Sequence, residues 1–275
     1  MSSPMGVWRN APLAYVLAEV RTELIAELTE YLPKIASRLR ERFPLQREVS
    51  SIRLVATPTG MTINPMQGKG WELATVDRRM AVLIRPNGLV LHTTKYEGGS
   101  KAFLPMLADV LTMFAEVVPA VFVNRIGLRY VDFVIPREGE TPEAYVSGRL
   151  NPDFGVGRGD RPYSGMIVSA YGREKGTLTL RYMRGHGQPE LPSDLDGLEL
   201  TPSPLMRGKD GKTSISDILP TAAIDTDRMY LFDPVEQLNA AKIIALYGDM
   251  HQDISGFFKN NVITEYANSI WNPAL

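Results

Sequence analysis

The chain has 275 residues, of which 44% are hydrophobic and 22% charged, an ordinary globular composition rather than a disordered or fibrous one. Thirty basic residues oppose thirty-one acidic ones, and the formal net charge of -1 disfavours nucleic acid and anionic membranes as partners. The lack of cysteine excludes disulfides, zinc–thiolate sites, iron–sulfur clusters and cysteine nucleophiles. Residues 1–10 show no apolar leader and no apolar run is long enough to span a bilayer, so we expect a cytoplasmic protein without a membrane segment.

The first half of the chain predicts a strand, a helix, a group of strands and a second helix. Its strands and hairpin are recognised by β-forming residues bounded by turn residues. They are Leu13–Arg21, Ser51–Thr57, Trp71–Asp77 and the hairpin Met80–Glu97. The hairpin turns at Pro86-Asn87-Gly88, where Asn-Gly supplies the positive φ angles of a tight turn. Leu28, Leu32, Ile35 and Leu39 recur at helical spacing and predict a first helix that ends near Phe43-Pro44, with Pro33 in its first turn or at a kink. A second helix is predicted from Ser100 to Pro119.

The second half of the chain repeats this order less clearly. Its predicted strands are Val121–Ile135, Gly165–Gly172, Thr177–Arg184 and Arg228–Phe232. Residues Pro142–Leu150 suit a short helix, and the Pro-, Gly- and Asp-rich residues 185–213 suit a long excursion. This weaker repeat indicates a degraded second copy of the first unit.

A capping box predicts the start of the last long helix. Asp233 suits the N-cap, Pro234 the first helical position, and Glu236 completes the box. The helix ends at Asn260-Asn261, before a last short helix to Trp271. It has a wide apolar stripe that includes Leu238, Leu246, Met250, Ile254, Phe257 and Phe258. We expect this stripe to pack against the protein's own sheet, because a sheet built from these strands needs covering helices.

The order β-α-β-β-β-β-α therefore occurs once cleanly and once in degraded form. We predict an α+β protein with tandem β-α-β4-α-like units, in which curved antiparallel sheet is backed by helices. The first unit covers residues 1–120, and the second covers 121–275, with the long loop 185–213 and the C-terminal helices. The alternative is that both units form one continuous domain. TATA-binding-protein-like repeats have this order of elements, which is a likeness of topology and carries no function.

Two glycine-rich stretches look like phosphate-binding loops but lack the required context. Gly208-Lys-Asp-Gly-Lys-Thr213 has Met206 where a P-loop needs glycine, and no strand leads into it, which favours a solvated turn. Gly155-Val-Gly-Arg-Gly159 follows no strand and opens no helix, which favours a plain loop. No two of the three histidines have a metal-ligand spacing, so we expect structural roles for them. The sequence predicts no catalytic residue, no metal ligand and no cofactor.

Charged residues inside apolar strands are the strongest signal of a site. Glu19 and Arg21 share one face of the first strand, and Arg125 and Arg129 share one face of Val121–Ile135. Ionised groups in a central strand are costly unless they are paired. One interpretation is structural: Glu19 pairs with Arg125 or Arg129 across neighbouring strands and fixes their register. The other is that Glu19, Arg21, Arg125 and Arg129 line a concave sheet face and bind an anionic ligand or partner.

Several segments resemble one family of bacterial proteins. Asn10–Arg21, with Asn-Ala-Pro-Leu and Ala-Glu-Val-Arg, is similar to its opening motif, and Thr94-Lys-Tyr-Glu97 to a short aromatic motif. Arg125-Ile-Gly-Leu-Arg-Tyr130 is similar to its central strand, while His251 and Phe258 fit its C-terminal pattern. The family is sporadically distributed and uncharacterised, its members have about this length, and the resemblance spans most of the chain. It implies no substrate or cofactor, but a patchy distribution implies carriage on mobile elements, which often hold defence or toxin–antitoxin genes.

From these observations we expect a non-enzymatic binding or regulatory module of the bacterial cytoplasm, in a defence or toxin-neutralising system. Its expected partner is another protein, a second copy of the chain or a small anionic ligand, with nucleic acid disfavoured and no membrane. The alternative is an enzyme acting on a phosphorylated or carboxylated small molecule. In that case Arg125 or Arg129 holds the anion and Glu19 is the acid/base.

Overall fold

The computed structural model describes residues 8, 10–57, 60–150, 164–195, 200–201 and 219–272, with the side chains of residues 50–69 left out. The two glycine-rich stretches discussed above, at residues 155–159 and 208–213, lie outside the described residues. So does most of the excursion predicted at residues 185–213.

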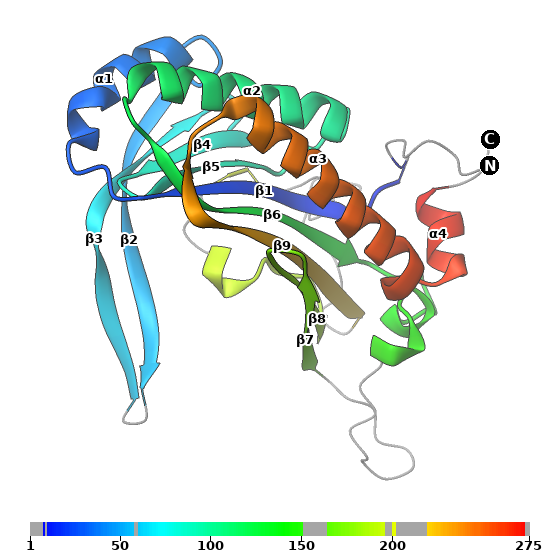
Figure 1. Ribbon diagram of the computed structural model, residues 1–275. Coiled ribbons are helices and arrows are strands. Elements are labelled where there is room, and N and C mark those ends of the chain that lie inside the picture. Colours follow the sequence, from blue (N-terminus) through cyan, green and yellow to red (C-terminus); the bar gives the residue numbers. More distant parts are fainter. Residues whose placement is uncertain are drawn as a thin grey trace.

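One antiparallel sheet of nine strands organises the described chain, in the order β2-β3-β4-β5-β1-β6-β9-β8-β7 (Figure 1). The strands are β1 (Leu13–Thr22), β2 (Leu45–Thr57), β3 (Gly60–Ala74), β4 (Met80–Arg85), β5 (Gly88–Thr93), β6 (Phe122–Val134), β7 (Gly165–Arg173), β8 (Gly176–His186) and β9 (Pro220–Gln237). The sheet curves beneath a layer of helices (Figure 1). The predicted α+β class, with a curved antiparallel sheet backed by helices, is confirmed.

The two stretches predicted as separate units, residues 1–120 and 121–275, contribute to this one sheet. The first contributes β2-β3-β4-β5-β1 and the second contributes β6-β9-β8-β7, so β1 and β6 are neighbours. Where the first unit has a helix after its first strand, the second has two 3-10 turns, η1 (Pro142–Ala144) and η2 (Gly148–Leu150). The predicted boundary near residue 120 falls between α2 and β6, and the largest hydrophobic cluster contains residues from both sides of it.

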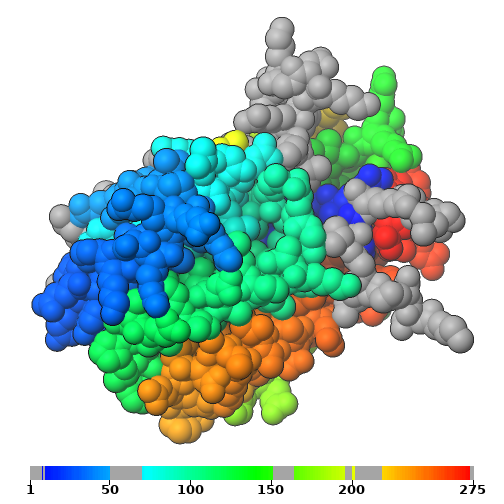
Figure 2. Space-filling view, turned by 90° about the horizontal axis from the view of Figure 1, so that it is seen from above, coloured from blue at the N-terminus to red at the C-terminus, as the bar shows by residue number. Residues whose placement is uncertain are grey.

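Three long helices lie side by side on one face of the sheet, which we call the helix face (Figures 1 and 2). They are α1 (Leu28–Leu39), α2 (Ser100–Val117) and α3 (Ala240–Phe257), and the short α4 (Glu265–Trp271) follows α3. Alternate residues of β1, Val16, Ala18 and Val20, are fully buried in the core beneath the helices. The intervening residues, among them Glu19 and Arg21, lie on the other face, which we call the open face. No helix in the described ranges is long and apolar enough to cross a membrane.

Several element boundaries differ from the sequence prediction, and β2 begins at Leu45 rather than Ser51 and β3 at Gly60 rather than Trp71. Asp233, Pro234 and Glu236 lie inside β9 and do not cap a helix, because β6 pairs with β9 as far as Phe122 and Gln237. The true N-cap of α3 is Asn239, whose side chain accepts a hydrogen bond from the Lys242 amide at 3.0 Å.

The first helix also differs from its prediction. It ends at Leu39 rather than near Phe43, and Pro33 lies in its second turn. In the β4–β5 hairpin the predicted turn forms, but only Gly88 has a positive φ, and Asn87 does not.

Gly88 is required where the β4–β5 turn meets β1. Its φ is +146°, and an added Cβ would lie 2.2 Å from the Val20 carbonyl oxygen. Alanine here must displace a central strand, so we expect Gly88→Ala to lower the free energy of unfolding by about 2–4 kcal/mol. Gly256→Ala, in α3 with nothing within 4 Å of the added Cβ, should raise it by about 0.5–1 kcal/mol. Urea unfolding of both variants checks this, and equal effects would refute the close contact.

Candidate functional site

A row of arginines crosses the open face of the sheet at the β4–β5 turn. Arg21 of β1 lies opposite Arg125 of β6 on one side and Gly88 of β5 on the other. Gly88 in turn lies opposite Arg85 of β4. Because Gly88 has no side chain, a gap separates the side chains of Arg85 and Arg21 in this row.

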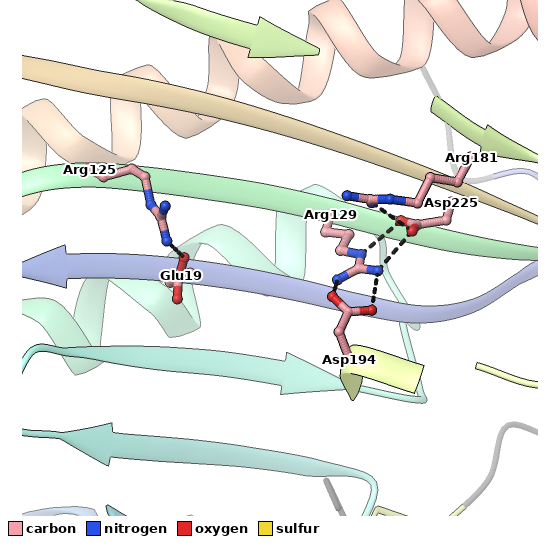
Figure 3. A network of polar contacts seen from close by, with 6 residues as sticks. All are labelled: Glu19, Arg125, Arg129, Arg181, Asp194 and Asp225. Carbon is pink, nitrogen blue, oxygen red and sulfur yellow. Dashed lines mark hydrogen bonds and ion pairs between the residues drawn. The ribbon is translucent and has the colours of Figure 1, made fainter. Parts of the chain in front are cut away.

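Glu19 binds two of these arginines. Arg21 Nε donates to one carboxylate oxygen of Glu19 at 2.7 Å. Arg125 Nη2 donates to the other oxygen at 2.9 Å (Figure 3). The predicted ion pair between Glu19 and Arg125 across neighbouring strands is therefore confirmed. It joins β1 to β6 at the centre of the sheet.

Arg85 is the arginine of this row that has no ion-pair partner among the described residues. Its Nε is buried and donates a hydrogen bond to no acceptor among the described residues. Burial, and then the positive charge of Arg21, lower the pKa of Arg85 below its ordinary value. We name Glu19, Arg21, Arg85 and Arg125 the arginine cluster. Its three guanidinium groups face one carboxylate, which leaves a surplus of two positive charges.

The arginine cluster borders a small hollow in the sheet surface. Glu19, Arg21, Arg85, Gly88 and Val90 are among its lining residues, and its volume is about 10 Å³. That is room for about one water molecule. The hollow is thus a shallow depression, far smaller than the about 300–1,000 Å³ pockets that enclose small ligands.

Arg129 belongs to a separate network on the same face. Its guanidinium donates to Asp225 at 2.7 and 2.8 Å and to Asp194 at 2.6 and 3.0 Å, and Arg181 adds a bond to Asp225 at 2.9 Å (Figure 3). The Asp225 side chain is fully buried. Burial lowers the pKa of Arg129, but the bonds to both aspartates outweigh it and raise that pKa above its ordinary value. Arg129 is therefore saturated by carboxylates, and the structure does not bring it into the arginine cluster.

The segment around η3 (Ser193–Leu195) covers this other end of the open face. Asp194 ties it to Arg129, and Leu195 is buried in a cluster with Tyr15 and Phe133. The side chains of Glu19, Arg21 and Arg125 are between 20% and 34% exposed, so the arginine cluster is accessible to solvent.

A second polar cluster lies on the helix face and joins three segments that are far apart in the sequence. The hydroxyl groups of Tyr96 and Tyr130 are 3.2 Å apart, and Tyr130 Oη lies 2.8 Å from His251 Nδ1 of α3. Burial lowers the pKa of His251 and raises that of Tyr130, which favours a neutral imidazole that accepts a hydrogen bond from the Tyr130 hydroxyl. Nearby on β6, burial raises the pKa of Asp132 to about 8. This cluster fastens α3 to the sheet and does not reach the open face.

Sequence reasoning missed Arg85 and the partners of Arg129. The signal for Arg85 was present, since alternation along Met80–Arg85 places it with Leu83 on the face opposite the core residues Val82 and Ile84. The partner Asp225 was missed because β9 was predicted to start only at Arg228, which left the Thr221–Asp227 half of the strand out.

No protein-family model, no curated protein and no solved structure matches the chain. The family resemblance stays a prediction. Within the part of the chain that the structure describes, no three His, Asp or Glu side chains are grouped so as to hold a metal ion.

Proposed function

We propose that this protein is a binding or regulatory module whose open sheet face binds an anionic group of a partner. The observation that carries the proposal is Arg85, a half-buried arginine with a buried, unpartnered Nε in a cluster of surplus positive charge. A buried polar donor without an acceptor costs free energy, which an incoming anion would recover.

The geometry of the cluster suits a carboxylate or phosphate. Neighbouring strands lie about 4.8 Å apart, so the backbones of Arg85 and Arg21, separated only by β5, are about 10 Å apart. Long guanidinium side chains at that spacing can converge on one anion from two sides above Gly88. Glu19 orients Arg21 and Arg125 from below and leaves their remaining N–H donors for the ligand.

The shallow hollow favours a group presented on the surface of a larger partner. A protein carrying an acidic segment fits this description, and the near-zero net charge of the chain disfavours nucleic acid. Placement in the bacterial cytoplasm, and in a defence or toxin-neutralising system, is part of the proposal and is supported by the family resemblance alone.

The enzyme alternative has less support from the same geometry. It needs Glu19 to take and release a proton beside a bound small molecule. Both Glu19 oxygens already accept hydrogen bonds, one from the Arg21 guanidinium and one from the Arg125 guanidinium. Glu19 is thus better placed to orient Arg21 and Arg125 than to act as a base.

The test is Arg85→Gln, because Arg85 has no ion pair to lose. We expect binding of a fluorescein-labelled polyglutamate peptide, measured by fluorescence polarisation, to weaken about tenfold or more, since hydrogen bonds to charged groups contribute about 1.5–3 kcal/mol. The melting temperature should stay unchanged or rise, because the variant removes a partly desolvated charge.

Arg38→Gln is the matched control, since Arg38 lies on α1, away from the open face, and pairs with the exposed Glu116. It should leave polyglutamate binding unchanged. Inorganic pyrophosphate and a single-stranded oligonucleotide, used as competitors, distinguish a general anion site and a nucleic-acid site from a carboxylate site. Equal affinity of the peptide for wild type, Arg85→Gln and Arg38→Gln, or no binding of any probe, would refute the proposal.

A further inference from the structure

The edge strand β7 presents an unguarded surface at one end of the sheet. Among the described residues β7 pairs only with β8, so its other edge has no strand beside it. The stretch Gly165-Met-Ile-Val-Ser-Ala-Tyr-Gly172 contains no charged residue and no proline. Met166 and Val168 on the open face are 61% and 54% exposed.

Natural edge strands are normally protected against pairing with another chain. Charged side chains, proline, bulges or a covering element do this, and an uncharged exposed edge is a template for strand addition. The strand at the opposite edge follows the rule, because the sequence of β2 contains Arg47, Glu48 and Arg53. β7 has no charged residue and no proline over the eight residues Gly165–Gly172, which indicates a strand whose free edge pairs with another strand in the functional protein.

The hairpin fixes which main-chain groups of β7 face outward. Arg173 and Gly176 flank the two-residue turn and form the closing pair of the β7–β8 hairpin, which is hydrogen-bonded in hairpins of this length. Alternate residues back from Arg173 therefore bond to β8. The residues between them direct their N–H and C=O groups to the free edge, and they are Met166, Val168, Ala170 and Gly172.

We propose that β7 pairs antiparallel with β7 of a second copy of this chain, about a two-fold axis at Ser169. In this register Val168 lies opposite Ala170 of the second copy, and Met166 lies opposite Gly172 of the second copy. Large exposed side chains thus meet small ones, while outward main-chain groups bond to each other. Across the other face Ile167 meets Tyr171 of the second copy, a β-branched and aromatic pair that stabilises neighbouring strands.

The distribution of charged residues along β7 supports a second copy of the chain as its partner. Arg173, the charged residue of β7, lies at the end of the strand, where Gly165 of the second copy would face it. Arg173 also already pairs with Asp253 of its own chain at 2.9 Å. No two like charges therefore oppose each other along the strand, and the two nine-stranded sheets become continuous. An interface of one strand pair and few side chains lies at the small end of specific interfaces, so we expect a reversible dimer with a micromolar Kd.

Sedimentation velocity of the full chain from about 1 to about 200 µM tests the proposal, since self-association depends on concentration. Wild type should pass from monomer to dimer. Ala170→Pro removes an outward N–H but no bond to β8, and Val168→Lys places a charge at the edge without changing the backbone. Both should remain monomeric over the range. Val76→Lys is the matched control, since Val76 is also an exposed valine but lies in the β3–β4 connection, and it should dimerise like wild type.

A single cysteine tests the register. Ser169 lies on the two-fold axis at a non-hydrogen-bonded pair, where the two Cα atoms are about 4.5 Å apart, within the about 4.4–6.8 Å that a disulfide spans. Because the chain has no other cysteine, Ser169→Cys should form a disulfide dimer on mild oxidation, and Val76→Cys should not. A wild type that stays monomeric, dimers that survive both β7 substitutions, or Ser169→Cys that cross-links no better than Val76→Cys would overturn the proposal.

Discussion

Asp225→Asn is expected to lower the free energy of unfolding by about 3–5 kcal/mol, the largest effect of any conservative change that we predict. Asp225 is fully buried and accepts hydrogen bonds from both Arg129 and Arg181. Asparagine keeps the shape of the side chain but removes its charge. The Arg129 guanidinium, itself 7% exposed, then keeps its charge beside a neutral amide. Only the exposed Asp194 then balances the buried charge of Arg129, and this partial loss of compensation is the reason for the large effect.

Asp194→Asn is the matched control for Asp225→Asn. It makes the same chemical change in a second partner of the same arginine, but the Asp194 side chain is 62% exposed. Exposed ion pairs contribute about 0–1 kcal/mol, so we expect a loss within that range. Urea unfolding followed by circular dichroism measures both variants. Similar losses for the two aspartates would show that burial does not determine the strength of this network.

The element types were largely predictable because the hydrophobic pattern is strong. Leu13–Thr22 forms a central strand and Ser100–Val117 a helix with one buried face, close to the predicted Leu13–Arg21 and Ser100–Pro119, since both have long, regular apolar patterns. The first half of β9 was not predicted, because Ala222, Ala223, Asp225 and Asp227 are not β-forming residues. Pairing with β6 and β8 on both sides holds that segment extended, and such tertiary support is not visible in local sequence.

The part of the candidate site that depends on which residues share one face of a strand was predictable from the sequence. Alternation placed Glu19 with Arg21, and the high cost of a charge in a central strand predicted a pair with Arg125 or Arg129. The structure shows Arg125 as the partner. Which strands lie side by side was not available from the sequence. β1 lies between β5 and β6, and only that order places Arg85 near Arg21 and leaves Arg129 to the aspartates of β9. The composition of the arginine cluster is thus a property of sheet order.

Phe258→Ala is expected to lower the free energy of unfolding by about 3–5 kcal/mol through the cavity it leaves. Phe258 begins the π-helical turn after α3 and is 8% exposed. It packs in the hydrophobic cluster that joins the second half of the sheet to the C-terminal helix and includes Tyr145, Val262 and Trp271. The apolar stripe of α3 therefore packs within the protein, as its sequence predicted, and its end anchors α4.

Comparing Phe257→Ala with Phe258→Ala distinguishes packing inside the core from packing at its edge. Successive residues on a helix point about 100° apart, so Phe257 and Phe258 do not enter the same part of the core. Phe257 is half-buried and contacts the Tyr171 ring at 4.9 Å and the Arg173 guanidinium at 5.9 Å. Those contacts contribute about 1–2 kcal/mol, and we expect a loss of that size. Unfolding free energies from urea titration should therefore rank Phe258→Ala well below Phe257→Ala. A Phe258→Ala variant within about 1 kcal/mol of wild type, as for a surface residue, would mean that the aromatic end of α3 contributes little to the protein's own core.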